Sequence, residues 1–404
     1  MTERQGGCCA AKGFSASGVY AGVRKNPEKK DLALIYAECD CSVAALYTTN
    51  RVKAAPIYVT MRNLERGTTR AIIANSGNAN ACAPGGEENA QKICDTLAKE
   101  LGIKPDEIII NSTGVIGVPL PVDAVTGAIP QLTRGLSRYG SDDAANAIMT
   151  TDTFAKQVAV ETKIAGKTVR IGGIAKGSGM IHPNMATMLA FITTDIAITS
   201  EMLKTALTES NRITYNRISV DGDTSTNDMV AILASGLAKN TQIEWKDTDY
   251  RVFLEALNYV NGKLAKMIAR DGEGATKLVS CLVKGASSEE AAEKLAMSVI
   301  SSSLVKAAMF GADANWGREI CAMGYSKAPF KPELTDISFV SGGESIAVCK
   351  DGAGLSFNEA DAKRILEREE IQILVDVHDG VFEAEAFGCD LTYEYVRING
   401  DYRT

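Results

Sequence analysis

Histidine is the scarcest of the common catalytic residue types in this sequence. Its 404 residues include two histidines, His182 and His378, and no serine stands in a G-x-S-x-G turn. These absences argue against a Ser-His-Asp hydrolase. Residues 172–178 superficially resemble a phosphate-binding loop, but the lysine precedes Gly177, whereas such loops require Gly-Lys-Ser or Gly-Lys-Thr. Nucleotide chemistry is therefore poorly supported as well.

Cysteine pairs, basic clusters and long apolar runs are also too few to indicate a metal, nucleic-acid or membrane role. The ten cysteines include no C-x-x-C pair, and the close pairs at 8–9 and 39–41 have no histidine nearby. We therefore expect free thiols in a reducing compartment and no metal site. A net charge of −7 argues against a nucleic-acid partner, and no apolar run approaches the ~20 residues of a membrane span. We see no secretory signal in the first residues and expect a cytoplasmic protein.

The hydrophobic residues, 45% of the chain, lie in alternating strand-like and helix-like segments. This alternation predicts a layered α/β (α+β) fold, and the length is enough for two or three domains. The clearest boundary divides the chain into domains 1–285 and 286–404. Just after it, Ser287 and Glu290 form a capping box that predicts a long helix to about Met309. We expect strands at residues 31–38, 70–74, 107–111, 158–164, 167–174, 188–192, 371–377 and 391–398, and helices at 87–101, 122–136, 199–210, 250–268 and 358–368.

The most informative segment is residues 176–195, which joins a glycine-rich turn to an apolar strand. Thr187 follows Ala186 at this junction, and a threonine placed after a small residue suits self-cleavage. Its hydroxyl can attack the Ala186 carbonyl, and hydrolysis of the ester leaves Thr187 with a free α-amine. That amine titrates near pH ~7.7–8.0 and can serve as the base for the same hydroxyl. The alternative is a loop that leads into a buried strand, with Thr187 as an ordinary β-branched residue.

Three further segments can complete an acyl-transfer site around such a threonine. The Thr113 hydroxyl and the Gly114 backbone N–H follow a strand and can bind an oxyanion, although an ordinary strand-to-turn transition would look the same. Glu273 stands between two glycines and is either an approachable carboxylate or part of a polar loop. Lys176 can hold a substrate carboxylate as a point charge.

An acidic segment at residues 221–228 also has two interpretations. Asp221, Asp223 and Asp228 can bind a cation, but their spacing misses the EF-hand pattern. A solvated turn with a helix cap is the better interpretation.

Eight segments, in order and spread over nearly the whole chain, resemble ornithine acetyltransferase of arginine biosynthesis, also called glutamate N-acetyltransferase. An ordered set of this kind is far more specific than any single motif. It therefore favours the catalytic interpretations of Thr187 and Glu273. The segments are residues 48–56 (TTNRVKAAP), 74–81 (ANSGNANA), 111–117 (NSTGVIG), 176–195, 221–228 (DGDTSTND), 269–276 (ARDGEGAT), 311–317 (GADANWG) and 399–404 (NGDYRT).

The resemblance implies the fold of the self-processing aminopeptidases and ornithine acetyltransferases, with a C-terminal α/β domain. It implies a cut between Ala186 and Thr187, which gives an α chain of residues 1–186 and a β chain of residues 187–404, assembled as α2β2 or larger. Within residues 150–153 it implies one threonine contact, for which Thr153 is chosen and Thr150 is the rival. The other matching positions imply Thr187 as nucleophile, Thr113 and Gly114 as oxyanion hole, and Lys176, Glu273, Asn399 and Thr404 as substrate contacts.

The reaction implied by the resemblance transfers the acetyl group of N2-acetylornithine to glutamate through an acetyl-Thr187 intermediate. The donor and product amides are nearly isoenergetic, so we expect no required cofactor. The sequence leaves open whether acetyl-CoA serves as a second acetyl donor, because some members of the family use it and some do not. A self-processing aminopeptidase or amidase, with water as the acceptor, is the alternative function; the matches at Lys176, Asn399 and Thr404 favour the transferase.

Overall fold

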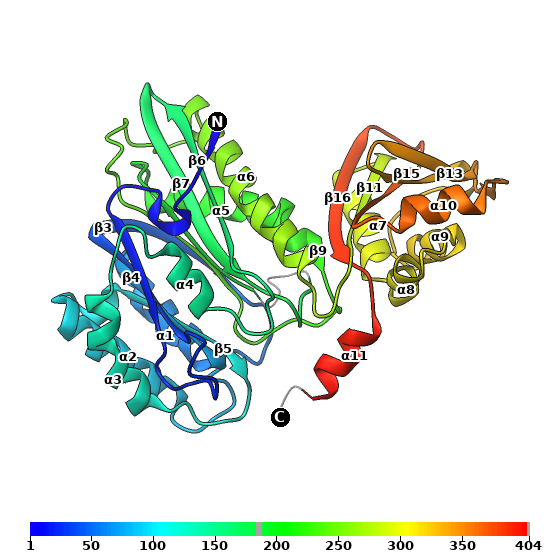
Figure 1. Ribbon diagram of the computed structural model, residues 1–404. Helices are drawn as coiled ribbons and strands as arrows, with labels where there is room; N and C mark the ends of the chain where they lie inside the picture. The colour runs from blue at the N-terminus through cyan, green and yellow to red at the C-terminus, as the bar shows by residue number, and fades with distance from the viewer. Residues whose placement is uncertain (183–187, 402–404) are drawn as a thin grey trace. The chain divides into compact units, whose positions relative to one another are not determined.

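The computed structural model describes residues 1–182 and 188–401, which form two compact units (Figure 1). The first unit holds Met1–Gly177, Thr224–Leu264 and the described part of Asn184–Asn216. The second unit holds Arg217–Asp223 and, as far as they are described, Ala265–Thr404 and Ser178–Pro183. Each unit is built around its own β-sheet with helices packed on it, so the predicted layered α/β class is confirmed. The predicted division after residue 285 falls inside the second unit and stays a proposal.

Nine described strands form the sheet of the first unit, which mixes parallel and antiparallel pairs. The parallel pairs are β8 with β10 and β4 with β5. The strands predicted at residues 158–164 and 167–174 are β6 and β7, which pair as an antiparallel hairpin, and Ala165 at its turn adopts a left-handed φ of 48°. The strand order is β1 (Thr2–Arg4), β6 (Lys156–Ile164), β7 (Lys167–Lys176), β8 (Leu189–Thr194), β10 (Met229–Ala234), β3 (Leu32–Tyr47), β4 (Thr68–Asn78) and β5 (Ile108–Val115), with β2 (Phe14–Val19) also paired to β3.

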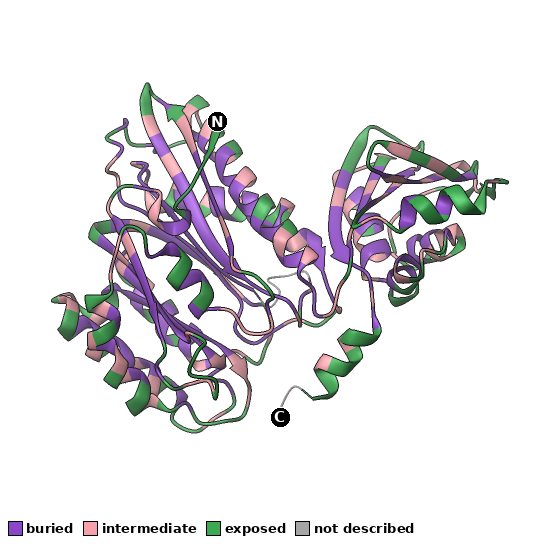
Figure 2. Ribbon diagram, viewed as in Figure 1, coloured by how far each residue is buried: buried purple, intermediate pink, exposed green. Residues whose placement is uncertain are grey.

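Helices cover this sheet on both faces because neighbouring residues of a strand point to opposite sides. Leu34 and Ile110 lie in one apolar core with residues of α2 (Gly86–Leu101) and α3 (Val122–Arg134). Their strand neighbours Ile35 and Ile109 lie in another core with residues of α4 (Ser141–Ala147). Figure 2 shows the result, with buried strands and exposed residues on the outer sides of α2 and α3. The remaining helices are α1 (Ala55–Asn63), α5 (Ser200–Ile213) and α6 (Thr248–Arg270), which continues into the second unit.

Seven described strands form the sheet of the second unit. α7 (Glu289–Ser301) packs on this sheet, and its Leu295 and Val299 share an apolar core with Cys281 and Ile373 of the strands. The strand order is β14 (Ala353–Gly354), β13 (Glu344–Lys350), β12 (Asp336–Ser341), β15 (Glu370–Asp376), β11 (Leu278–Ala286), β16 (Phe382–Cys389) and β9 (Ile218–Ser219). The other helices are α8 (Ser303–Gly311), α9 (Trp316–Gly324), α10 (Glu359–Leu366) and α11 (Tyr393–Gly400).

The predicted long helix from residue 287 to about Met309 is wrong, because two helices occupy this segment. Ser302 has an extended backbone (φ −70°, ψ 116°) and its hydroxyl accepts the Val305 N–H, so it ends α7 and caps α8. The N-cap of α7 is Ser288, which accepts the Ala291 N–H at 3.1 Å. The predicted capping box therefore starts one residue too early.

The predicted strand at residues 391–398 is also wrong, because this segment forms α11. Its tyrosines, valine and isoleucine favour a strand. However, the Thr392 hydroxyl accepts the Glu394 N–H at 3.2 Å and caps a helix. Arg397 then pairs with Glu394 one turn away, at 2.5 Å. Local capping thus outweighs strand propensity here.

Candidate active site

Thr113 and Gly114 lie at the end of β5, beside β4. Thr113 is 4% exposed, and Lys176 Nζ donates to its Oγ1 at 3.5 Å. Gly114 has a φ of 135°, and a Cβ at this position would lie 2.3 Å from the carbonyl carbon of Gly77. Only glycine can therefore occupy the position. The structure thus brings the predicted oxyanion residues next to one predicted substrate contact.

Lys176 ends β7 and is 3% exposed. Its Nζ lies 4.0 Å from Oδ2 of Asp152, whose Oδ1 bonds Lys156 Nζ at 2.7 Å and the Gly177 N–H at 2.8 Å. Burial alone would raise the pKa of Asp152, but the charges of Lys176 and Lys156 and these hydrogen bonds hold it well below its usual range. Asp152 is therefore ionised at neutral pH and balances positive charge beside Thr113.

The two rival threonines flank Asp152. The Thr150 N–H donates to Asp152 Oδ2 at 3.0 Å, and its carbonyl accepts from Arg24 at 2.7 Å. Thr153 is exposed, whereas Thr150 is half-buried. Both thus adjoin the carboxylate that contacts Lys176, and the choice of Thr153 stays a prediction.

Met188, the residue after the predicted nucleophile, has both its backbone N–H and its backbone carbonyl in hydrogen bonds. Its N–H donates to Asp228 Oδ1 at 3.0 Å, and its carbonyl accepts the Met229 N–H at 3.1 Å. The next residue, Leu189, pairs with Lys176 of β7. Strand register therefore places the described side of the junction beside Lys176.

Three predicted site residues lie outside the described residues. Ala186 and Thr187, which form the predicted cleavage site and supply the nucleophile, belong to the segment 183–187. Thr404, a predicted substrate contact, belongs to residues 402–404. Their roles stay predictions.

Glu273 and Asn399, two further predicted substrate contacts, touch each other in the second unit. Glu273 follows α6 and is 7% exposed, and its Oε2 accepts from Asn399 Nδ2 at 2.7 Å. Gly179 makes room for this carboxylate, because a Cβ at residue 179 would lie 2.4 Å from Glu273 Cδ. Asn399 reaches Glu273 from α11, where the sequence had predicted the end of a strand. A pair expected from separate motifs is thus assembled by tertiary packing.

The acidic segment 221–228 is divided between the units. Asp221, in the second unit, accepts the N–H groups of Met180 at 2.6 Å and Ile181 at 2.8 Å, which fixes the turn after Gly179. Asp228, in the first unit, holds Met188. Within residues 1–182 and 188–401, no three His, Cys, Asp or Glu side chains are grouped to hold a metal ion. Both aspartates therefore act as backbone acceptors in this structure.

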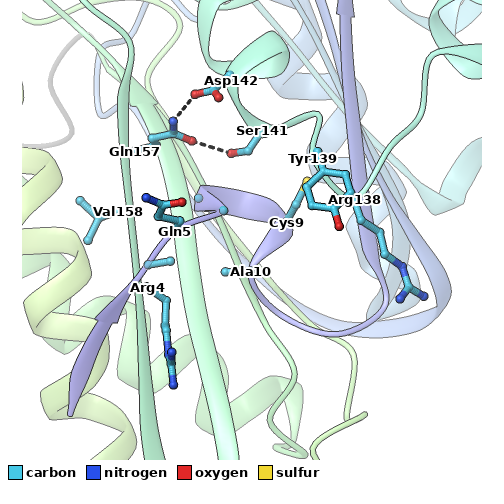
Figure 3. Close-up of a pocket in the computed structure, with 13 residues that line it drawn as sticks. Arg4, Gln5, Cys9, Ala10, Arg138, Tyr139, Ser141, Asp142, Gln157 and Val158 are labelled. Atoms are coloured by element: carbon cyan, nitrogen blue, oxygen red, sulfur yellow. Dashed lines mark hydrogen bonds between the residues drawn. The ribbon is translucent and has the colours of Figure 1, made fainter.

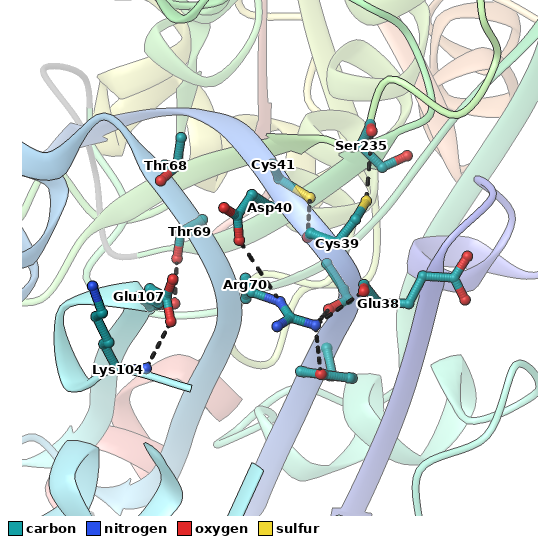
Figure 4. A network of polar contacts seen from close by, with 12 residues as sticks. Glu38, Cys39, Asp40, Cys41, Thr68, Thr69, Arg70, Lys104, Glu107 and Ser235 are labelled. Atoms are coloured by element: carbon teal, nitrogen blue, oxygen red, sulfur yellow. Dashed lines mark hydrogen bonds and ion pairs between the residues drawn. The ribbon is translucent and has the colours of Figure 1, made fainter. Parts of the chain in front are cut away.

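All ten cysteines are free thiols. Cys39 and Cys41 lie near Arg70 at an irregular part of β3, where Cys41 Sγ contacts the Cys39 carbonyl at 3.5 Å (Figure 4). A hydrogen bond from the Cys41 thiol lowers the pKa of Cys39 to about 7.

Among the helices of the described part of the chain, none has the length and apolarity needed to cross a bilayer.

An open cavity of about 780 Å³ lies elsewhere in the first unit, around β1 and β6 (Figure 3). Its polar side chains bond one another: the Ser141 hydroxyl donates to Gln157 Oε1 at 2.9 Å, and the Gln157 amide donates to Asp142. None of the described site residues predicted from the sequence lines this cavity. It is therefore separate from the candidate active site.

Sequence reasoning missed three residues that shape the site: Asp152, Asp228 and Gly179. Asp152 stands between the two rival threonines, in the segment that the motif indicated, but its carboxylate was not itself considered. Asp228 was considered as a cation ligand or as part of a solvated turn with a helix cap, and not as an acceptor for the backbone of Met188. Gly179 belongs to the glycine-rich turn, whose spacing does not reveal that a carboxylate from residue 273 needs its space.

Comparison with known proteins identifies one family. The chain matches the ArgJ family over residues 15–404. It is 52% identical over 392 residues to the arginine biosynthesis bifunctional protein ArgJ 1 of Clostridium acetobutylicum, covering 97% of this chain and 96% of the relative. It is 51% identical over 401 residues to the arginine biosynthesis bifunctional protein ArgJ of Symbiobacterium thermophilum, covering 99% of each.

A solved structure agrees with this result. The crystal structure of the arginine biosynthesis bifunctional protein argJ from Bacillus halodurans is 47% identical, with a TM-score of 0.51, and the match covers 53% of this chain and 99% of that chain. The layered fold and the full-length matches define a biosynthetic enzyme of mixed α/β architecture. The chain belongs to the ArgJ family. The family resemblance predicted from the sequence is thereby confirmed.

Proposed function

We propose that this protein transfers the acetyl group of N2-acetylornithine to glutamate, in arginine biosynthesis. The observation that carries the proposal is the family match over residues 15–404. Two contacts support it: Lys176 on Thr113 in the first unit, and Asn399 on Glu273 in the second. Both contacts join residues that the sequence assigned to one site.

The nucleophile of this reaction is the Thr187 hydroxyl. Its oxygen attacks the acetyl carbon while the Thr187 α-amine takes the hydroxyl proton. The C–N bond of the donor breaks, the nitrogen receives that proton, and ornithine leaves. The amine of glutamate then attacks the acetyl ester, which restores the hydroxyl and releases N-acetylglutamate.

Thr113 and Gly114 stabilise the oxyanion in both halves of the reaction. Because Thr113 Oγ1 accepts from Lys176, its own hydroxyl hydrogen is directed elsewhere and can be donated. A donor of this kind typically contributes about 10²–10³ in rate. The Lys176 charge suits the α-carboxylate that donor and acceptor share, and Glu273, Asn399, Thr153 and Thr404 complete the substrate contacts.

The free α-amine of Thr187 arises from self-cleavage. Attack of the Thr187 hydroxyl on the Ala186 carbonyl forms an ester and breaks the C–N bond, and water then leaves a carboxylate on Ala186. The match to the solved ArgJ structure supports such a cut. It includes 99% of that chain but only 53% of this chain, so the solved chain corresponds in length to about half of this one. The fragment 187–404 is likewise a little over half of 404 residues. The two fragments, 1–186 and 187–404, then assemble as α2β2.

The relatives carry the word bifunctional in their names, which supports a second activity. We assign it to acetyl-CoA as an alternative donor, which would acetylate Thr187 and yield N-acetylglutamate without ornithine. No other cofactor is needed, and the cytoplasm is the expected compartment.

Mass spectrometry and steady-state kinetics test the proposal together. The purified protein should give two fragments, the second beginning at Thr187, whereas Thr187→Ala should give one uncut and inactive chain. Initial rates against acetylornithine at several glutamate concentrations should give parallel double-reciprocal lines. Acetyl-CoA is assayed as a separate donor. An uncut wild-type chain with full activity would refute the nucleophile, and release of free acetate without N-acetylglutamate would indicate an amidase.

A further inference from the structure

Asp228 is a fully buried carboxyl group to which the proposed reaction gives no role. It directly precedes β10 and is 0% exposed. Its Oδ1 accepts the Met188 N–H at 3.0 Å, and its Oδ2 has no hydrogen-bond partner among the described residues. The nearby Thr48 hydroxyl donates to the Ser225 carbonyl at 2.6 Å instead. The hydrogen bond from the Met188 N–H thus ties this side chain to the residue that follows the predicted nucleophile.

We propose that Asp228 is a positioning residue for the self-cleavage at Ala186–Thr187, and that it acts by holding the backbone of Met188. This role rests on the proposed function, since it presupposes the cut. Attack of the Thr187 hydroxyl needs a defined backbone direction on the C-terminal side of the scissile bond. Asp228 supplies that direction one residue beyond the bond.

The register of the sheet explains why a side chain is needed here. The parallel pairing of β8 with β10 begins at Leu189 and Met229. Met188 lies before this pairing, so its N–H has no strand partner of its own. The Asp228 carboxyl takes the place of that partner, while the Met229 N–H bonds the Met188 carbonyl. Both backbone groups of Met188 are thereby fixed.

The acceptor oxygen of Asp228 determines which substitute can keep this contact. Burial raises the pKa of Asp228 well above its usual range, and the Met188 N–H and the charge of Lys176 offset this only in part. Oδ1 of Asp228 accepts the Met188 N–H. Asparagine presents the same oxygen, whereas alanine presents none.

Asp195 provides a matched control at the other end of β8. It is also fully buried, and it accepts the backbone N–H groups of Arg170 at 2.8 Å and Lys12 at 3.2 Å. Burial raises the pKa of Asp195 too. Asp195→Ala therefore removes a comparable set of contacts from the same strand, but at the end of the strand away from the cleavage junction.

The test follows cleavage of the full chain by pulse–chase in cell-free translation, with thermal melting of each purified variant. We expect Asp228→Ala to slow the appearance of the 187–404 fragment at least 10-fold, and Asp228→Asn to stay within about 3-fold of wild type. Asp195→Ala should lower the melting temperature as much as Asp228→Ala and leave the cleavage rate unchanged.

Distinct results overturn the role of Asp228 and the proposed function. A wild-type chain that stays whole overturns both. Wild-type cleavage together with equal rates for Asp228→Ala and Asp195→Ala overturns the positioning role alone. If Asp228→Ala does not fold, Asp228→Asn decides: cleavage slowed 10-fold or more in a folded Asp228→Asn protein shows that the accepting oxygen is not what Asp228 contributes.

Discussion

Replacing Asp152 with asparagine should destabilise the first unit far more than the small change in size suggests. The carboxylate lies between two buried ammonium groups, 2.7 Å from Lys156 and 4.0 Å from Lys176. Asparagine keeps the shape but removes the negative charge, and neither lysine is exposed enough to regain water. Removing one partner of a buried ion pair typically costs about 3–5 kcal/mol. For a unit of this size, that corresponds to a fall in Tm of roughly 6–20 °C.

Scanning calorimetry at neutral pH, without substrate, measures this fall. Asp142→Asn is the matched control, because Asp142 is an exposed carboxylate that bonds the Gln157 side chain. The double variant Asp152→Asn with Lys156→Met removes one of the two buried lysine charges that Asp152 balances in wild type, and it should therefore recover part of the lost stability. A Tm for Asp152→Asn within about 2 °C of the control would refute the reasoning.

The pH dependence of stability gives an independent check on Asp152. Its pKa in the folded protein is held below the unfolded value of about 3.9. The folded state therefore takes up this proton less readily, so the stabilisation is complete above the unfolded pKa and is lost as the pH falls through the folded pKa. Asp152→Asn should lose less stability than wild type over that acidic range.

Three further predictions concern the oxyanion donor, a buried carboxyl and the chain end. Thr113→Ala should lower kcat for acetyl transfer by about 10²-fold with little change in KM, because the donor acts mainly in the transition state; a rise in KM alone would make Thr113 a binding residue. Glu319 is fully buried, its carboxylate oxygens have no hydrogen-bond partner among the described residues, and burial raises its pKa to about 8. The contribution of the Glu319 carboxyl to folding stability is complete below the unfolded pKa of about 4.3 and is lost as the pH rises through the folded pKa. Glu319→Leu should therefore raise the melting temperature more at pH ~8 than at pH ~5. An equal rise at both pH values would show that Glu319 does not titrate in this way. Deleting residues 402–404 should cripple acetyl transfer and leave the cut intact, because Asn399 just before them contacts Glu273; wild-type turnover of the truncated enzyme would remove the tail from the site.

The elements predicted correctly are those whose local signals agree with their packing. The helix at residues 87–101 has its apolar stripe and a glycine with φ of 66° at its end. The β6–β7 hairpin follows from two apolar runs around Ala165-Gly166. In α11, by contrast, strand-forming residues compete with the Thr392 cap, and the burial that would favour a strand is absent because most of the helix is exposed.

The sequence by itself determined the family, and with it the identity of the candidate site residues. Catalytic groups must keep their chemical type and their place in a motif, so they can be recognised from the amino-acid sequence alone. Thr113, Lys176 and Glu273 could therefore be named before any contact was known.

Only the tertiary structure decided which groups these residues contact. Asp152 beside Lys176, Asn399 on Glu273 and Asp228 on Met188 join residues from different strands, turns and helices. Gly179 and Gly114 are required because another segment comes close to them. Such contacts arise from strand register and from side-chain packing between segments that are distant in the sequence. The spacing of residues along the chain predicts neither of these.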